Sequence, residues 1–422
     1  MKSEFFDISQ DLLLKADEAM KEVGEALERA EDIARYNTEK VLSAFIKNHA
    51  SESKLAASTG YGYGDAGRET LEAIWADVMG AEDSIIRHNF MSGTHAICIA
   101  LFGILRPGDS FISATGRPYD TLVDVIGIDK QTDGSLKDFG VEYRECPLKE
   151  GRVDITRLCE MLKKKSTKMV YIQRSRGYSL RPSLTVEDIE EIAVAVKKVQ
   201  PDVIVAVDNC YGEFTQKKEP TEVGADLIIG SLIKNAGGGI APTGGYIAGK
   251  RDLVEKCANR LTTPSTGKEI GSTLGHSREL YMGVFNAPHV TGEALKTAIF
   301  ASALFSKFGY EVTPQPNEDR GDIIQAICLK NSESLIAFCE GIQAGAPMDS
   351  FVRPEPWDMP GYDSKVIMAA GAFTQGASVE LSADAPLREP FAVWLQGGLT
   401  FDSARIGILL AAQQMIDKKI LG

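Results

Sequence analysis

The apolar positions between residues 9 and 48 repeat at the three- and four-residue spacing of an amphipathic helix, from Leu12 to Ala34. A glycine-rich stretch, STGYGYGDAGRET, follows this pattern, and helical spacing returns in LEAIWADVMGA. We therefore predict a helical N-terminal arm over residues 1–50 and a glycine-rich loop that interrupts the helices.

Short apolar runs alternate with helical patterns between residues 92 and 250. The runs SFISA, MVYIQ, VIVAVDN, DLIIGS and GGYIAG have the length of strands, and THAICIALFGIL and VEDIEEIAVAVKKV have helical spacing. Such alternation is typical of βαβ units around a parallel or mostly parallel sheet. After about residue 290 the pattern changes to that of a smaller α+β domain. We expect a large domain over 51–290 and a small domain over 291–422.

Composition and charge limit the kinds of binding partner and the cellular compartment that we expect for this protein. The chain has 422 residues and a net charge of −13, so nucleic acid and anionic membranes would meet a repulsive field. The seven cysteines form no CxxC pair, which favours reduced thiols over a disulfide frame or a metal site. No apolar run approaches the ~18 residues that span a bilayer, and the N-terminus lacks a signal-peptide core. We predict a cytoplasmic protein without a membrane, metal or nucleic-acid partner.

Two residues with complementary chemistry follow neighbouring predicted strands. Asp208 lies near the carboxyl end of VIVAVDN, and Lys234 lies just beyond DLIIGS. In open α/β sheets, ligands bind at the carboxyl ends of the strands. A carboxylate and an amine at one edge suit a pyridine cofactor, because the acid keeps the ring nitrogen protonated and the amine forms an imine. The plain alternatives are a surface lysine and an aspartate that caps a turn.

A Ser-Gly-Thr turn, Ser92, Gly93 and Thr94, immediately precedes one of the predicted helices. Its backbone N–H groups and hydroxyls lie at the positive end of a helix dipole, which is a common phosphate site. An ordinary N-cap is the alternative.

The segment from Gly62 to Gly67 satisfies the GxGxxG pattern of dinucleotide-binding proteins. That pattern requires a strand directly before it, and the preceding SESKLAAST is polar. A dinucleotide-dependent dehydrogenase is therefore disfavoured.

Several strings together resemble the pyridoxal-phosphate enzymes of fold type I, and specifically the cystathionine and methionine lyase group. Within that group the chain looks most similar to methionine gamma-lyase-like, or aluminium-resistance, proteins. The resemblance covers nearly the whole chain and rests on GYGYGDAGRETLE, SGTHAI, GRPYDTL, VDNCYGEF, SLIKNAGGGIAPTGGYIAG and LSADAPLREPF. It implies an aspartate-aminotransferase-like α/β fold with a mostly parallel sheet in the large domain, a smaller α+β C-terminal domain, pyridoxal 5'-phosphate as cofactor and an amino acid as substrate.

The resemblance also implies roles for single residues. Lys234 would be the Schiff-base lysine, and Asp208 would hold the pyridine nitrogen. Tyr119, in GRPYDTL, matches the tyrosine that stacks on the cofactor ring and assists proton transfer to the sulfur leaving group, although a core tyrosine is the alternative. The phosphate would be held by Ser92, Gly93, Thr94 and Ser231.

The lyase group completes each phosphate site with a tyrosine and an arginine from the neighbouring subunit. Tyr61, Tyr63 and Arg68 lie in the corresponding segment of this chain, but the usual Tyr-x-Arg spacing is missing. Which of them reaches across stays open. The resemblance implies a homodimer or homotetramer with shared active sites.

The chain departs from the lyase group where QRSRGYSLRPS replaces a short Pro-Asn-Pro loop. Arg174, Arg176 and Arg181 in this loop could hold the ring hydroxyl or a second acidic group of a substrate. The substrate carboxylate normally meets an arginine of the C-terminal domain, for which Arg388 is the candidate, with Arg405 behind it. Solvated surface arginines are the alternative.

The predicted activity is β- or γ-elimination that breaks a carbon–sulfur bond of a sulfur amino acid, as in cystathionine beta-lyase or methionine gamma-lyase. Lys234 would act as the general base on the substrate's α-proton. Transamination or aldol-type cleavage would use the same lysine and aspartate, so both stay open. A cofactor-binding stress protein with vestigial activity is the third reading.

Overall fold

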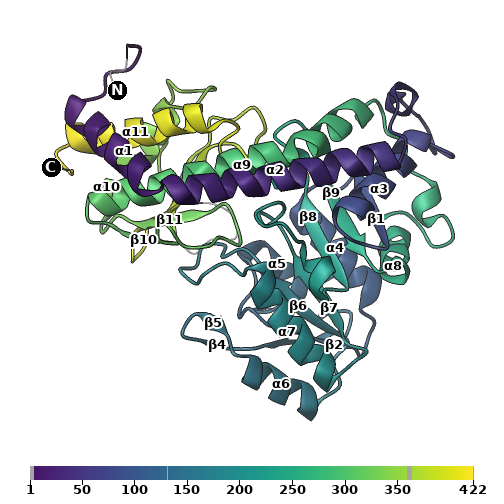
Figure 1. Ribbon diagram of the computed structural model, residues 1–422. Coiled ribbons are helices and arrows are strands. Elements are labelled where there is room, and N and C mark those ends of the chain that lie inside the picture. Colours follow the sequence, from purple (N-terminus) through teal and green to yellow (C-terminus); the bar gives the residue numbers. More distant parts are fainter. Residues whose placement is uncertain (1–3, 131, 359–363, 422) are drawn as a thin grey trace. The chain divides into compact units, whose positions relative to one another are not determined.

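The computed structural model describes residues 4–130, 132–358 and 364–421. The chain divides into two compact units, one formed by Met1–Arg35 with Pro288–Gly422 and the other by Tyr36–Ala287. Helices α2 (Gly24–Lys47) and α9 (Ser277–Lys307) each contribute to both units, and the boundary in α9 falls at a proline within the helix (Figure 1).

The second unit is built on a seven-stranded sheet with the order β1-β9-β8-β7-β6-β2-β3. Only β9 runs antiparallel to its neighbours, and the other pairs are parallel, which confirms the predicted mostly parallel sheet. The strands are β1 (Asp83–Arg87), β2 (Ser110–Ser113), β3 (Glu142–Glu145), β6 (Met169–Gln173), β7 (Ile204–Asp208), β8 (Leu227–Ser231) and β9 (Gly245–Gly249).

Helices cover both faces of this sheet. Alternate residues of β7 contribute to two separate apolar clusters: Val205 and Val207 pack with α3, α6 and α7, whereas Ile204 and Ala206 pack with α4, α5 and α8. Period-two alternation of buried side chains is expected where a strand is covered on both sides. These helices are α3 (Ala66–Val78), α4 (Gly93–Ile104), α5 (Asp120–Ile126), α6 (Ile155–Lys164), α7 (Val186–Val199) and α8 (Arg251–Leu261).

The first unit contains a five-stranded sheet, in which every pair of neighbours is antiparallel. Its order is β10-β11-β14-β13-β12. The strands are β10 (Glu311–Thr313), β11 (Gln325–Cys328), β12 (Val366–Ala369), β13 (Ser382–Pro386) and β14 (Ala392–Gln396). The helices wholly within this unit are α1 (Gln10–Glu22), α10 (Ser332–Ala344) and α11 (Phe401–Asp417).

The unit formed by Tyr36–Ala287 also contains several short elements. A two-stranded sheet pairs β4 (Leu148–Lys149) with β5 (Arg152–Val153). The 3-10 helices are η1 (Glu52–Leu55), η2 (Pro220–Val223), η3 (Asn235–Gly237) and η4 (Gly267–Glu269). Among the described residues, none of the helices combines the length and the apolarity needed to cross a bilayer.

The predicted elements of the large domain agree closely with the observed ones. The helical pattern between residues 186 and 199 is α7, and the five apolar runs are β2, β6, β7, β8 and β9. The helical arm is present but is divided into α1 and α2, because the chain leaves helical geometry at Val23, before Gly24.

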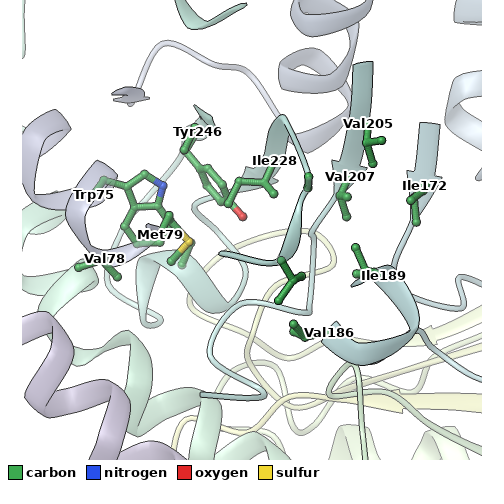
Figure 2. Close-up of a cluster of buried hydrophobic side chains, with 14 of the residues drawn as sticks. Trp75, Val78, Met79, Ile172, Val186, Ile189, Val205, Val207, Ile228 and Tyr246 are labelled. Atoms are coloured by element: carbon green, nitrogen blue, oxygen red, sulfur yellow. The ribbon is translucent and has the colours of Figure 1, made fainter. Parts of the chain in front are cut away.

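Trp75 anchors the core between α3 and the sheet. Its ring is fully buried and lies edge-on to the rings of Tyr246, at 4.8 Å, and Phe214, at 6.0 Å. Figure 2 shows Trp75 and Tyr246 side by side, with Val78 and Met79 of the α3 end beneath them. Few surrounding side chains can move to fill the volume that this indole occupies.

Replacing Trp75 with alanine should therefore lower the free energy of unfolding by about 3–5 kcal/mol. Urea denaturation followed by circular dichroism measures this loss. Trp357→Ala is the matched control, since Trp357 is half-exposed, and it should change stability by less than about 0.5 kcal/mol. A loss below about 1 kcal/mol for Trp75→Ala would contradict the packing described here.

Candidate active site

Asp208 is the last residue of β7 and lies at the carboxyl end of the parallel strands, opposite Gln173 of β6. Its Oδ1 accepts a hydrogen bond of 3.1 Å from the Cys210 N–H, and its Oδ2 accepts one of 3.3 Å from the Tyr171 hydroxyl. Burial raises the pKa of Asp208, and the positive charge of Lys234 opposes this shift. The carboxyl is thus oriented by two donors in a dry environment, where a cationic partner would hold it ionised.

Lys234 lies three residues after the end of β8, the strand next to β7. Its Nζ is 4.0 Å from the centroid of the Tyr211 ring, which belongs to the turn after Asp208. The side chain is only partly buried. The structure therefore brings the predicted amine and carboxyl to the same edge of the sheet, with an aromatic face beside the amine.

The glycines that follow Lys234 are required by close approach of the backbone. A Cβ at Gly237 would lie 1.8 Å from the Leu232 carbonyl oxygen, and one at Gly238 would lie 2.4 Å from the Gly283 carbonyl oxygen. Gly238 also has a φ of 55°, in the left-handed region that glycine adopts without strain. The chain can therefore turn tightly after Lys234 and pack against α9.

The predicted phosphate turn lies at the N-terminus of α4, against the end of β8. The Ser92 hydroxyl caps the helix by accepting a 3.1 Å hydrogen bond from the His95 N–H, and the hydroxyls of Thr94 and Thr121 are 2.9 Å apart. A Cβ at Gly93 would lie 3.2 Å from the Ser231 Cβ. The turn and Ser231, far apart in the sequence, are therefore neighbours.

Ser231 fits the role of an anion ligand. Its side chain is buried, and its Oγ has no hydrogen-bond partner among the residues that the structure describes. A buried hydroxyl without a partner costs free energy unless a ligand or water satisfies it. Its position beside the first turn of α4 is where a phosphate would receive backbone N–H groups and the positive end of the helix dipole.

Tyr119 lies directly before α5 and is tied to the same edge of the sheet. Its backbone N–H donates a 2.7 Å hydrogen bond to the Gln173 Oε1, and Gln173 is the residue of β6 opposite Asp208. The Tyr119 ring meets that of Tyr178 edge-on at 6.0 Å and is partly exposed. This is not the environment of a fully buried core tyrosine, and its stacking on a cofactor stays a prediction.

Residues of the glycine-rich segment differ sharply in exposure. Tyr61 and Tyr63 are 69% and 67% exposed, and their rings stack on each other at 5.5 Å. Arg68 is buried, and its Nη1 donates to the carbonyl oxygens of Gly62 at 2.8 Å and Gly271 at 2.7 Å. Arg68 thus holds its own segment in place, while the two tyrosines are accessible.

The arginines of the loop after β6 have different environments. Arg174 is fully buried and donates to the Asn209 Oδ1 at 2.8 Å and to the Gly212 carbonyl oxygen at 2.9 Å. Arg181 donates to backbone carbonyls of Gln173 and the same loop. Both therefore support the turn after β7 and the loop itself, whereas the role of Arg176, which is also buried, stays a prediction.

The C-terminal candidates lie in the other unit. Arg388 is exposed in the turn between β13 and β14. Arg405, in α11, is 3.3 Å from the Asp17 carboxylate and lies over the Phe300 ring at 5.6 Å. Arg405 is thus engaged within its own unit, and Arg388 is the more accessible of the two.

Three residues at this edge of the sheet, Tyr171, Tyr211 and Glu213, were not predicted as site residues from the sequence. Tyr171 is a polar group inside the otherwise apolar run MVYIQ, and the other two follow Asp208 in DNCYGEF. Tyr211 has a φ of 68°, which is unusual for a non-glycine residue. Two features of the sequence could have indicated these residues. One is a tyrosine inside an otherwise apolar strand, and the other is the group of polar residues that follows the strand ending at Asp208.

The chain matches a known protein family over nearly its whole length. Residues 12–416 match the family described as methionine gamma-lyase. The chain belongs to the methionine gamma-lyase family. A solved relative from Clostridium acetobutylicum, named "putative cystathionine beta-lyase involved in aluminum resistance", is 50% identical with a TM-score of 0.95, over 97% of this chain and 96% of that one. The uncharacterized protein YnbB of Bacillus subtilis is 46% identical over 93% of each chain.

A more distant solved structure shows the wider fold class. The pyridoxal-5'-phosphate-dependent protein YhfS of Escherichia coli is 15% identical, with a TM-score of 0.63, and the match covers 91% of this chain and 96% of that one. Membership of the methionine gamma-lyase family and this likeness place the chain in fold type I of the pyridoxal-phosphate-dependent proteins. It is a protein of the cystathionine and methionine lyase type.

Proposed function

We propose that this member of the methionine gamma-lyase family is a pyridoxal-phosphate-dependent carbon–sulfur lyase that acts on a sulfur amino acid by β- or γ-elimination. One observation carries the proposal. Lys234 and Asp208 lie at the carboxyl ends of adjacent parallel strands, and the Ser231 hydroxyl, which has no partner among the described residues, lies beside the α4 N-terminus. An amine, a carboxyl and an anion site at one edge match the three polar parts of this cofactor.

Each residue would supply one part of the chemistry. The cofactor, when bound, would accept the electron pair that the substrate's α-carbon retains after losing its proton. The Asp208 carboxylate would keep a proton on the ring nitrogen, and the Lys234 Nζ would remove the α-proton as general base. The Tyr119 hydroxyl would give a proton to the sulfur as the carbon–sulfur bond breaks.

The residues that would bind the phosphate and the substrate are part of the same proposal. The phosphate would be held by the Ser231 hydroxyl and by the turn of Ser92, Gly93 and Thr94. Arg176 and Arg388 are proposed to bind the acidic groups of the substrate, because a guanidinium can donate two parallel hydrogen bonds to a carboxylate.

We further propose a homodimer or homotetramer with shared active sites. Tyr61 and Tyr63 present a stacked aromatic pair to solvent, and large exposed aromatic side chains are enriched at protein interfaces. Arg68, which orders this segment, would act by positioning the tyrosines or by reaching the neighbouring phosphate.

Product analysis tests the proposed activity. Purified protein loaded with pyridoxal phosphate should convert at least one of cystathionine, methionine, cysteine and homocysteine to a 2-oxo acid, ammonia and a sulfur product in equal amounts. Transfer of the amino group to an added 2-oxo acid, without release of a sulfur product, would replace the proposal with transamination. Absence of α-proton exchange with all four amino acids would favour a vestigial activity and contradict the lyase.

A further inference from the structure

Glu213 is a buried acid with no role in the chemistry described above. It lies five residues after Asp208, and its side chain is completely buried. Its Oε1 accepts a 2.8 Å hydrogen bond from the Tyr246 hydroxyl of β9. A Cβ at Gly230 of β8 would lie 2.5 Å from the same oxygen. The carboxyl therefore lies against the backbone of β8, one residue before Ser231.

The surroundings of the Glu213 carboxyl do not compensate a full negative charge. Its Oε2 is buried and has no hydrogen-bond partner within the described ranges, nor does any lysine or arginine there form an ion pair with it. The neighbouring titratable groups are Tyr246, Glu219, Cys210 and Lys234. Burial raises the pKa of Glu213 to about 8, and the nearby Glu219 adds to the shift, whereas the residue's own backbone N–H, the Tyr246 hydroxyl and Lys234 oppose it.

Glu219 shows what a compensated carboxylate in the same segment looks like. Its Oε1 accepts a 2.8 Å hydrogen bond from the Phe214 N–H, and its Oε2 accepts one of 3.0 Å from the Asn209 side chain. The Arg174 guanidinium is 3.7 Å away. The fully buried Arg174 therefore compensates Glu219, whereas no lysine or arginine among the described residues forms an ion pair with Glu213, which is therefore stabilised as a neutral acid.

Glu213 is linked to the Lys234 segment at two points. The Asn235 side chain, directly after Lys234, donates a 3.0 Å hydrogen bond to the Glu213 backbone carbonyl. Tyr211, two residues before Glu213, places its ring 4.0 Å from the Lys234 Nζ. The turn that carries Glu213 therefore contacts the segment of the lysine, and a charge on Glu213 would act on Lys234 through a dry interior.

We propose that Glu213 is a positioning residue for Lys234, a neutral carboxylic acid at neutral pH whose ionisation would place a negative charge near the lysine and favour its protonated form. This role rests on the proposed function of Lys234 as the lysine that carries the cofactor. In this role Glu213 would act through Lys234, without contact with the cofactor or the substrate. Glu213→Gln is the matched variant, because an amide has the shape of a neutral acid but cannot ionise.

The first test uses the protein without cofactor. An unfolded glutamate loses its proton near the ordinary pKa of 4.5, whereas the folded protein retains the proton up to about pH 8. Since the folded state then binds more protons, the wild type should lose stability as pH rises through this window. The urea midpoint of Glu213→Gln should match the wild type near pH 4.5 and exceed it increasingly up to pH 8. If the difference in urea midpoint between the two proteins did not change with pH, the proposal that Glu213 is a neutral acid would be wrong.

The second test uses the protein loaded with pyridoxal phosphate and follows its visible absorbance from pH 6 to 10, a range that brackets the expected ionisation. The wild type should show an ionisation near pH 8 that is absent from Glu213→Gln. The midpoint of the lysine-linked transition should lie lower in the variant, by ~0.5 pH unit or more, because no negative charge develops near Lys234. Identical titrations of the two proteins would overturn the proposed coupling.

Tyr246→Phe provides a second variant if Glu213→Gln does not fold. Loss of the hydroxyl that donates to Glu213 should move the ionisation near pH 8 to higher pH, and an unmoved ionisation would count against the proposal. Failure of the proposed function is distinguishable from these outcomes. A wild type that forms no lysine-linked absorbance would refute the cofactor role of Lys234, while the urea comparison would still decide whether Glu213 is neutral.

Discussion

Purified Lys234→Ala protein should remain folded, lose the yellow colour of the lysine-bound cofactor and lose elimination activity by ~10⁴-fold or more. The variant removes the only amine that the structure places beside Tyr211 and Asp208 at the edge of the sheet, within the described residues. Lys234 would serve both as the attachment point and as the base, so one substitution removes two contributions. Visible absorbance and 2-oxo acid release measure them separately.

Lys218→Ala is the control for this experiment. Lys218 is exposed and lies in the same unit, in the segment that follows β7. Its replacement should leave colour and turnover within about twofold of the wild type, because exposed side chains outside a site rarely affect it. Wild-type turnover in Lys234→Ala would refute the assignment of the lysine.

Asp208→Asn should lower turnover by on the order of 10²- to 10³-fold, the usual effect of removing one preorganised electrostatic contact. The amide can still accept a hydrogen bond from the Cys210 N–H, and the Tyr171 hydroxyl can rotate to meet the amide. The fold should therefore survive, while the charge that would keep the ring nitrogen protonated is lost. Turnover per bound cofactor is the relevant measurement.

Asp226→Asn is the control for Asp208→Asn. Asp226 is also buried, but it precedes β8 at the opposite end of the strands, where it pairs with Lys197 and Lys250. Its replacement should cost stability and leave turnover per bound cofactor nearly unchanged. If the two variants lost turnover equally, the effect of Asp208→Asn would be structural rather than electrostatic.

The predicted elements of the large domain could be read from the sequence because their signals are local. The apolar run that ends at Asp208 and the cap formed by Ser92 each depend on a few neighbouring residues. The division of the helical arm at Val23 was missed, since its apolar spacing continues across that point. Two-residue strands such as β4 and β5 are too short for a periodic pattern to show.

The roles of the arginines in the loop after β6 could not be predicted from the sequence. Arg174, Arg176 and Arg181 have equal chemistry in the sequence, and all could have faced a ligand. In the structure Arg174 supports Asn209 and Gly212, and Arg181 supports the loop that carries it. A guanidinium's role depends on which carbonyls and carboxylates surround it, and these come from segments up to about forty residues away.

The sequence by itself determined the class of fold, the lysine and aspartate at two strand ends and the helix turn suited to a phosphate, because each depends on residues close together in the chain. Only the tertiary structure decided that Ser231 lies against Gly93, that the Tyr171 hydroxyl donates to Asp208, and that Glu213 is a buried acid whose backbone is linked to the Lys234 segment. These facts depend on the packing of distant segments. Burial and pairing set the charge of a carboxyl, and neither is visible in the residue order.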